Sequence, residues 1–320
     1  MWFQRFLRPR RALLLGAGAA VLAELFLGVR AGIDVLHSLS PARQSVASLT
    51  SLHSKLPLED VSFRAEDGLL IRGWYAPSKN DATVILLHGL WNTKESMLPQ
   101  AEMVGGAGFG VLLFDWRGQG ESEGTGATWG VDEQKDLVAA LGWLKTNHPA
   151  RAVGAVGVSM GGMALVEVAA RDATVRALVT EGTYPSLRDC AYELEAGWGP
   201  LTGYPGILSM KLFGPSFDKS RPIDHLRELH RPLLLIYGSE EHARQYDVAT
   251  HMYDAADPST TRLWMVQGAK HGAYAEVDPE GLRTRLVRFF TAALLDTGTN
   301  ALPALGDRAG ASLRTAGSPH

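Results

Sequence analysis

The sequence predicts an α/β protein with a mostly parallel central sheet and helices on both faces of that sheet. Short apolar runs rich in leucine or β-branched residues recur along the chain, and stretches of helical length separate them. Continuous apolar strands that alternate with helices are typical of a parallel sheet buried on both sides. No unit of roughly 20–50 residues repeats along the sequence, so a solenoid is not expected.

The first predicted element is a hairpin from Val61 to Tyr75, with its turn at Glu66-Asp67-Gly68. The later strands are predicted at Thr83–Leu87, Val111–Asp115, Ala152–Val158, Ala177–Thr180, Leu233–Tyr237 and Thr261–Val266. The helices that should cover the sheet are predicted at Lys94–Gly106, Val131–Asn147, Met160–Arg171, Tyr246–Ala256 and Pro279–Leu295.

One long segment, at about residues 184–230, breaks this alternation. Aromatic and apolar residues stand there among glycines and prolines. Because the segment lies between two strands, it should project over the C-terminal edge of the sheet and form a lid or pocket wall. The alternative is a surface excursion that packs on itself. Residues 296–320 are rich in Ala, Gly, Thr and Pro, and we expect a disordered tail there.

Charge and cysteine content exclude some functions. The formal net charge is −3, so the chain has no basic field for nucleic acid, and no nucleic acid partner is expected. The single cysteine, Cys190, excludes an intrachain disulfide and a thiolate metal cluster. We interpret Cys190 as a small packing residue rather than a reactive thiol.

The N-terminal residues 1–45 differ from the rest of the chain. Several arginines precede an apolar run from Ala12 to Val29, which only Glu24 interrupts, and Arg30 follows the run. A basic flank before an apolar segment is typical of a signal peptide or a membrane anchor. We favour an uncleaved membrane-anchoring helix over a cleaved signal or a soluble amphipathic start. The excess of arginine before the run then places the folded domain on the extracytoplasmic side of the membrane.

Two pentapeptides match the pattern G-x-S-x-G, one centred on Ser159 and one on Ser122. A nucleophilic serine needs a buried strand before it and a helix after it, because the sharp turn between them exposes the hydroxyl. Ser159 follows the predicted strand Ala152–Val158 and precedes an apolar helix. Ser122 lies in an acidic, glycine-rich loop without a helix behind it. The context therefore favours Ser159 as the nucleophile.

The base and the oxyanion site are predicted from loops at the C-terminal edge of the sheet. His271 follows the last predicted strand and is the candidate base, whereas His88 is expected to shape the oxyanion loop. The backbone N–H groups of Leu90 and Met160 are expected to form the oxyanion hole. Trp91 is a candidate wall of the substrate pocket, although a purely structural role is an open alternative.

The acid that orients the base is expected in the loop after the strand Leu233–Tyr237. Glu241 in this loop can accept the second N–H of the histidine and fix its tautomer. Glu181, at the end of another strand, is the main rival. Glu240 and Asp247 are further alternatives, and any of these carboxylates could instead be a solvated loop residue.

Four motifs in this order resemble the α/β-hydrolase superfamily. The similarity covers about residues 58–295 and is closest to an anchored esterase-like branch that also resembles monoacylglycerol lipases and serine aminopeptidases. The motifs are Leu87-His88-Gly89, Phe114-Asp115-Trp116-Arg117-Gly118-Gln119-Gly120-Glu121-Ser122, Gly157-Val158-Ser159-Met160-Gly161-Gly162 and Gly268-Ala269-Lys270-His271-Gly272.

The resemblance implies an α/β-hydrolase fold for residues 46–295, with the lid insertion, and the chain order serine, acid, histidine. It also implies a structural role for the segment that holds Ser122. Family members usually carry aspartate three residues after the glycine that ends the strand, whereas this chain has Glu241 there. The longer glutamate can serve, but the departure weakens the assignment of the acid.

These observations predict a serine hydrolase that cleaves carboxylic esters through an acyl-enzyme on Ser159, without a metal or organic cofactor. The expected substrate is a small-molecule acyl ester or a lipid-like ester. The alternatives are an amide or peptide hydrolase, because one triad serves both reactions, and a catalytically silent binding protein on the same fold. The sequence carries no signal for the oligomeric state.

Overall fold

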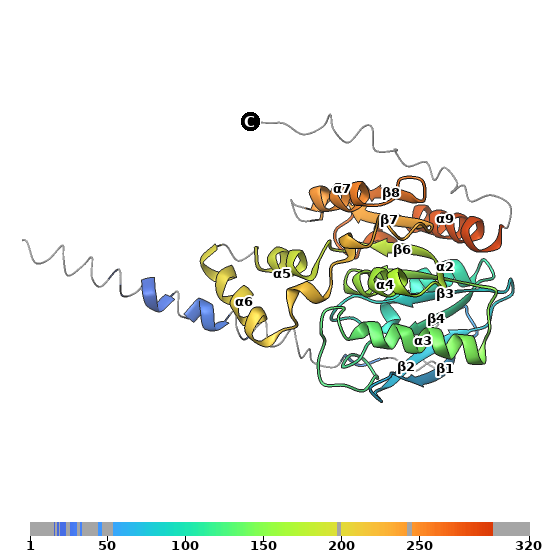
Figure 1. The fold of residues 1–320 in the computed structure, drawn as a ribbon, viewed down its shortest axis with the longest axis horizontal. Helices are drawn as coiled ribbons and strands as arrows, with labels where there is room; N and C mark the ends of the chain where they lie inside the picture. The colour runs from blue at the N-terminus through green and yellow to red at the C-terminus, as the bar shows by residue number, and fades with distance from the viewer. Residues whose placement is uncertain are drawn as a thin grey trace, which may run out of the picture.

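The computed structural model describes residues 16, 18, 20–23, 26–30, 33, 44–46, 54–196, 200–241 and 245–296. An eight-stranded sheet forms the centre of this part of the chain, in the order β1-β2-β4-β3-β5-β6-β7-β8 (Figure 1). The strands are β1 (Glu59–Arg64), β2 (Leu70–Ala76), β3 (Ala82–Leu87), β4 (Gly110–Phe114), β5 (Ala152–Val158), β6 (Val175–Glu181), β7 (Leu233–Gly238) and β8 (Thr261–Val266).

The sheet is parallel from β4 to β8 and antiparallel only at one edge. The hairpin strands β1 and β2 pair antiparallel, and β2 pairs antiparallel with β4. All later pairs are parallel. Strands β3 and β4 are buried along their whole length, which explains why their sequences are continuously apolar rather than alternating.

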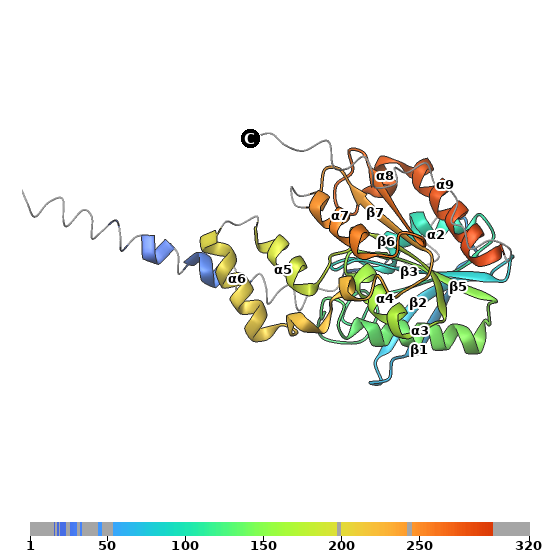
Figure 2. The same ribbon diagram turned by 45° about the horizontal axis from the view of Figure 1, so that its top comes forward.

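Helices cover both faces of the sheet (Figures 1 and 2). One face packs against α3 (Glu133–Asn147), α4 (Met160–Arg171) and α7 (Gln245–Ala255). The other face packs against α2 (Leu98–Gly105) and α9 (Pro279–Phe290). Successive residues of β3 alternate between the two cores, with Ile85 in the first and Leu86 in the second. The α/β-hydrolase fold predicted from the sequence is therefore confirmed.

Two predicted helices change character along their length. The helix expected at Lys94–Gly106 begins as a 3₁₀ turn at Lys94–Met97 and becomes α2 only at Leu98. Pro99 in the first turn of α2 suits this start, because an N-terminal residue of a helix needs no N–H partner. The helix expected at Pro279–Leu295 ends as α9 at Phe290 and continues as a π-helical turn over Thr291–Leu295.

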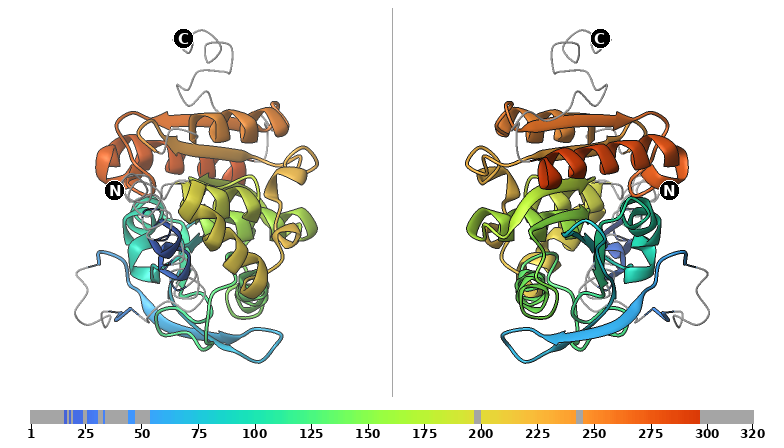
Figure 3. Two further views of the ribbon diagram at one scale, coloured as in Figure 1. Left: turned by 90° about the vertical axis from the view of Figure 1, so that its left-hand side faces the viewer. Right: turned by 90° about the vertical axis from the view of Figure 1, so that its right-hand side faces the viewer.

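The segment between β6 and β7 folds into α5 (Leu187–Ala196), α6 (Pro200–Phe213) and the short 3₁₀ turns Phe217–Lys219 and Pro222–Asp224. The two helices project from one end of the sheet, and Figure 3 shows them in yellow in front of that end. A separate apolar cluster joins them to the body of the protein through Met163 of α4 and Cys190 of α5. The insertion thus lies over the end of the sheet where β5 passes into α4.

The prediction of a membrane-anchoring N-terminal helix was wrong. Within the part of the chain that the structure describes, no helix combines the length and the apolar character that crossing a bilayer requires. The membrane association and the extracytoplasmic location were inferred from that anchor, so they are not supported either. Residues 297–320 of the tail predicted at 296–320, and most of residues 1–45, lie outside the described residues.

Candidate active site

Ser159 lies at the junction between β5 and α4, in a tight and strained turn. Its backbone has φ 52° and ψ −116°, a conformation that side-chain-bearing residues rarely adopt. A Cβ atom on Gly157 would lie 2.6 Å from the carbonyl oxygen of Gly161, so the chain can double back here only without one. The N–H of Ser159 donates to the carbonyl of Glu181 at 2.7 Å and fixes the turn to β6.

His271 lies in the loop after β8, and its ring nitrogen Nδ1 lies 3.0 Å from Oε2 of Glu241. The Glu241 side chain is fully buried, whereas the His271 side chain is 30 % exposed. Since a carboxylate only accepts, this contact places a proton on Nδ1 and leaves Nε2 free to accept another. The residues that the sequence predicted as acid and base are thus hydrogen-bonded to each other.

Tyr274 and Gly238 hold the second oxygen of Glu241. The hydroxyl of Tyr274 and the N–H of Gly238 each donate to Oε1 at 2.6 Å. Burial, together with the nearby charge of Glu241, raises the pKa of Tyr274, so its hydroxyl keeps the proton that it donates. Both carboxylate oxygens are therefore fixed, and the direction of the carboxylate toward His271 is fixed with them.

Gly182 lies directly behind the imidazole. Its φ is 63°, and a Cβ atom there would lie 2.7 Å from Cε1 of His271 and 2.4 Å from the hydroxyl oxygen of Tyr274. The close approach of these two side chains to the backbone therefore requires glycine. The sequence analysis missed both Gly182 and Tyr274. A glycine immediately after a buried strand was the one available signal.

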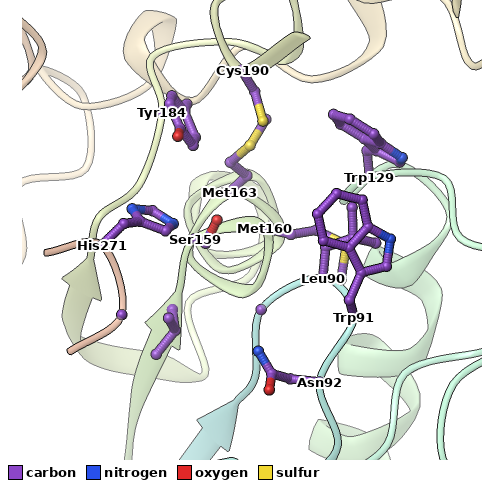
Figure 4. A pocket seen from close by; sticks show the side chains of 13 residues that line it. Leu90, Trp91, Asn92, Trp129, Ser159, Met160, Met163, Tyr184, Cys190 and His271 are labelled. Carbon is purple, nitrogen blue, oxygen red and sulfur yellow. The ribbon is translucent and has the colours of Figure 1, made fainter. Parts of the chain in front are cut away.

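Ser159 and His271 line one cavity of about 190 Å³. Figure 4 shows the hydroxyl of Ser159 between the imidazole on one side and the indoles of Trp91 and Trp129 on the other. The described residues that line the cavity are Gly89, Leu90, Trp91, Asn92, Trp129, Val158, Ser159, Met160, Met163, Tyr184, Cys190, His271 and Gly272. The cavity therefore joins the β5–α4 turn, the loop after β3, the loop after β8 and the insertion.

The backbone N–H groups of Leu90 and Met160 belong to residues that line this cavity. Met160 is the first residue of α4, where the helix leaves its N–H groups without an internal partner. Among the backbone hydrogen bonds of the described chain, neither N–H is used. Neither group is therefore engaged by another backbone group of the described chain.

Trp91 lies at the mouth of the cavity and is 44 % exposed. It adopts φ 61°, and its N–H donates to Oε1 of the buried Gln119 at 3.0 Å. The carbonyl of Trp91 accepts a hydrogen bond from the side chain of Gln44. Its ring meets Trp129 edge to face at 6.5 Å. Trp91, the predicted candidate for a pocket wall, is thus among the residues that line the cavity.

The other candidates from the sequence lie away from the cavity or are otherwise engaged. Ser122 is fully buried, and its hydroxyl donates to the carbonyl of Asp115 at 2.6 Å. Glu181 is buried against Gln100 of α2, which donates to it at 3.0 Å, and burial raises the pKa of Glu181 to about 7. Glu240 and Asp247 are exposed.

His88 is fully buried beside the oxyanion loop. Its Nδ1 donates to the carbonyl of Gly89 at 2.7 Å, and its Nε2 accepts the N–H of Trp116 at 3.2 Å. Burial lowers the pKa of His88 to about 4, so the ring is neutral at physiological pH. Both ring nitrogens are used within the protein, and His88 holds the backbone next to Leu90 rather than facing the cavity.

The site has the architecture of an α/β hydrolase. Its serine lies on the strained turn after β5, and its histidine, in the loop after β8, is held by a buried carboxylate from the loop after β7. Comparison with known proteins agrees. A family model described as "Serine aminopeptidase, S33" matches residues 78–196, a range that includes Ser159 but ends before Glu241 and His271. An uncharacterized protein of Escherichia coli K12, YfhR, is 27 % identical over 246 residues, which are 74 % of this chain and 81 % of that protein.

Two further relatives have named activities. The thiohydrolase aneE of Aspergillus aculeatus is 32 % identical over 139 residues, which are 41 % of this chain and 43 % of that protein. The crystal structure of the Pyrococcus furiosus esterase Pf2001 superimposes with a TM-score of 0.68 at 24 % identity, covering 80 % of this chain and all of that one. The chain has the α/β-hydrolase fold and is similar to hydrolases over the matched residues, and these findings support hydrolytic activity.

Proposed function

We propose that this protein is a serine hydrolase that cleaves carboxylic esters through an acyl-enzyme on Ser159. The observation that carries the proposal is the shared cavity, in which Ser159 stands on a strained turn beside an imidazole whose Nδ1 is held by the buried carboxylate of Glu241. A serine hydroxyl becomes an effective nucleophile only with such a base and an oriented partner for that base.

The proposed reaction assigns a role to each of these groups. Oγ of Ser159 attacks the ester carbonyl carbon, and Nε2 of His271 takes the hydroxyl proton. The oxyanion accepts hydrogen bonds from the N–H groups of Leu90 and Met160, each of which is worth ~3 kcal/mol of barrier reduction in comparable sites. His271 then protonates the departing alkoxide. Water, activated by the same imidazole, hydrolyses the acyl-enzyme, releases the acid and restores Ser159.

The lining of the cavity favours esters over aminoacyl amides. An α-aminoacyl substrate carries an ammonium group, which needs a carboxylate partner when it is buried. None of the described residues that line the cavity is acidic. The match to the serine aminopeptidase model keeps amide hydrolysis as the second candidate, and the partial similarity to a thiohydrolase makes thioesters worth including in the assay.

A fluorophosphonate probe tests the nucleophile. We expect the wild-type protein to be labelled and to hydrolyse p-nitrophenyl acetate, and Ser159→Ala to lose the labelling and at least 10³-fold in kcat. Ser122→Ala, the same substitution in the other G-x-S-x-G pentapeptide, is the matched control and should still be labelled. Retained labelling of Ser159→Ala would refute the assignment. Absence of labelling in the wild type would favour the silent binding protein.

An amide substrate tests the bond preference. Alanine p-nitroanilide and p-nitrophenyl acetate release related chromophores, so their kcat/KM values can be compared directly. We expect the ester to be the better substrate even after the difference in intrinsic reactivity is removed by comparison with alkaline hydrolysis. A larger enhancement for the anilide would establish the peptidase alternative.

A further inference from the structure

The cavity beside Ser159 has a defined acyl side, provided that the proposed function holds. His271 protonates the leaving group, so the leaving group must lie toward the imidazole. The acyl group then lies on the opposite side of Ser159. Figure 4 shows the indoles of Trp91 and Trp129 on this side, and Met163 and Cys190 above Ser159.

The acyl side is apolar, aromatic and rich in sulfur. Trp91 and Trp129 meet edge to face at 6.5 Å with an interplanar angle of 83°. Met163 and Cys190, both buried, add a thioether and a thiol to the same lining. Aromatic rings pack favourably against the edges and faces of other rings and against sulfur atoms. The chemistry of this wall therefore suits a flat ring better than a flexible hydrocarbon chain.

The volume of the cavity, which the acyl group shares with the leaving group, gives an upper limit on the size of the acyl group. The cavity volume of about 190 Å³ is well below the roughly 300–1,000 Å³ of pockets for drug-sized ligands. An apolar protein cavity of roughly 150 Å³ is known to hold one benzene molecule. The acyl side therefore has room for at most a single ring with a connection of one or two carbon atoms to the ester carbonyl.

The two indoles are held in place by unusual backbone conformations. Trp91 has φ 61° and Trp129 has φ 55°, both in the left-handed region. This conformation is a true outlier for a bulky residue, and such strain concentrates at ligand-binding sites. A wall that is fixed before the ligand arrives favours a rigid ligand, because neither partner then loses much conformational freedom.

From these observations we infer that the acyl site selects esters of small monocyclic aromatic acids, of the size of phenylacetic acid. Phenylacetyl and octanoyl groups contain the same number of carbon atoms but differ in shape. With p-nitrophenyl as the common leaving group, we expect kcat/KM for the phenylacetate to exceed that for the octanoate by about 10-fold or more, which is the scale of discrimination in apolar pockets.

Substitutions of the wall should change this ratio in a defined direction. Trp91→Gly removes one indole and accepts the positive φ without strain, so the phenylacetate-to-octanoate ratio should fall toward 1. Cys190→Phe fills the cavity from α5, and kcat/KM for the phenylacetate should fall at least 10-fold more than that for the acetate. Tyr192→Ala, which removes an exposed ring from the same helix, is the control and should leave the ratio unchanged.

A binding experiment separates this inference from the proposed mechanism. In Ser159→Ala, phenylacetate and octanoate are titrated against the intrinsic tryptophan fluorescence, and phenylacetate should bind at least 10-fold more tightly. Ester hydrolysis with octanoate preferred, or with a ratio that Trp91→Gly does not change, overturns the inference and leaves the esterase proposal intact. If no ester is cleaved, the esterase proposal fails, and the binding constants alone decide whether the aromatic site exists.

Discussion

The two G-x-S-x-G pentapeptides of this chain fold into opposite environments. Ser159 caps α4 in a strained turn, and its side chain lines a cavity. Ser122 is fully buried, and its hydroxyl accepts the N–H of Arg72 at 2.9 Å while it donates to the carbonyl of Asp115. The same five-residue pattern thus gives a hydroxyl that faces a cavity at Ser159 and a hydroxyl that is hydrogen-bonded within the protein at Ser122.

The flanking elements explain the difference. Strand β5 and helix α4 force a reversal at Ser159, and the side chain at this turn lines the cavity. The loop with Ser122 instead wraps around Asp115, whose carboxylate accepts hydrogen bonds from both the N–H and the Nζ of the buried Lys94, each at 2.7 Å. A polar group with all partners supplied by the protein supports the fold, whereas a polar group that faces a cavity is available for chemistry.

Among the substitutions around the cavity, Ser159→Ala apart, the largest fall in kcat is expected for Glu241→Gln. Oε1 accepts hydrogen bonds from Tyr274 and Gly238, so the glutamine oxygen should take that position and turn its NH₂ toward His271. Nδ1 would then have to accept, which moves the imidazole proton to Nε2 and removes the base. A comparable change in a serine protease lowers kcat by about 10⁴-fold, and we expect 10³–10⁴-fold here.

The control for this variant is Glu240→Gln, which changes the exposed neighbouring carboxylate and should keep full activity. Steady-state kinetics with p-nitrophenyl acetate and thermal unfolding of each variant are the measurements. An activity of Glu241→Gln within about 10-fold of the wild type, in a folded protein, would remove Glu241 from the proposed triad.

At the buried and fully hydrogen-bonded Ser122, the substitution Ser122→Ala should lower the stability of the protein and leave its activity unchanged. The substitution leaves the N–H of Arg72 and the carbonyl of Asp115 without their shared partner in a buried site, which costs about 1–3 kcal/mol in the free energy of unfolding. Ser96→Ala removes an exposed hydroxyl that donates to the carbonyl of Thr93, and water can replace it. Urea unfolding should therefore separate the two variants, and equal stabilities would show that burial does not matter here.

The sheet could be predicted from the sequence because each parallel strand is buried on both faces and is therefore continuously apolar. Predicted and observed strands differ by only one or two residues at most ends. Helices α5 and α6 were not predicted. The sequence of α6 contains Gly203, Pro205 and Gly206, which disfavour a helix, and its packing on the cluster with Met163 outweighs this weak local preference.

Only the candidate site residues that stand in local sequence patterns could be predicted. The context of strand, turn and helix was sufficient to favour Ser159 over Ser122, and the loop positions of Glu241 and His271 agree with their observed hydrogen bond. The contacts of Tyr274 and Gly182 could not be predicted from local pattern, because they join segments 33 residues or more apart in the sequence. The N-terminal anchor failed because a basic flank and an apolar run do not establish a long helix.

The smallest effect is expected for a substitution of Glu181, which the sequence analysis named beside Glu241 as a candidate acid. Glu181 differs from Glu241 because it is buried outside the loops that hold His271 and its Oε1 has no hydrogen-bond partner among the described residues. Burial raises its pKa from 4.5 to about 7 in the folded protein. Between these pH values the folded protein holds a proton that the unfolded chain has released. The stability from this group is therefore complete below pH 4.5 and is lost as the pH rises through 7.

Glu181→Gln should remove this pH dependence while kcat stays close to the wild-type value. At pH 8 the substitution replaces a buried charge. The pKa shift sets an upper limit of roughly 3 kcal/mol on the gain, and the amide brings unpaired polar atoms that offset most of it, so we expect a net stabilisation of about 1 kcal/mol. At pH 5 the gain should vanish, because the carboxyl is then already neutral in the folded state. Urea unfolding of both proteins at the two pH values, with the exposed Glu276→Gln as control, measures the difference. A pH-independent difference would show that Glu181 stays ionised when buried, and a collapse of kcat would return the acid role to Glu181.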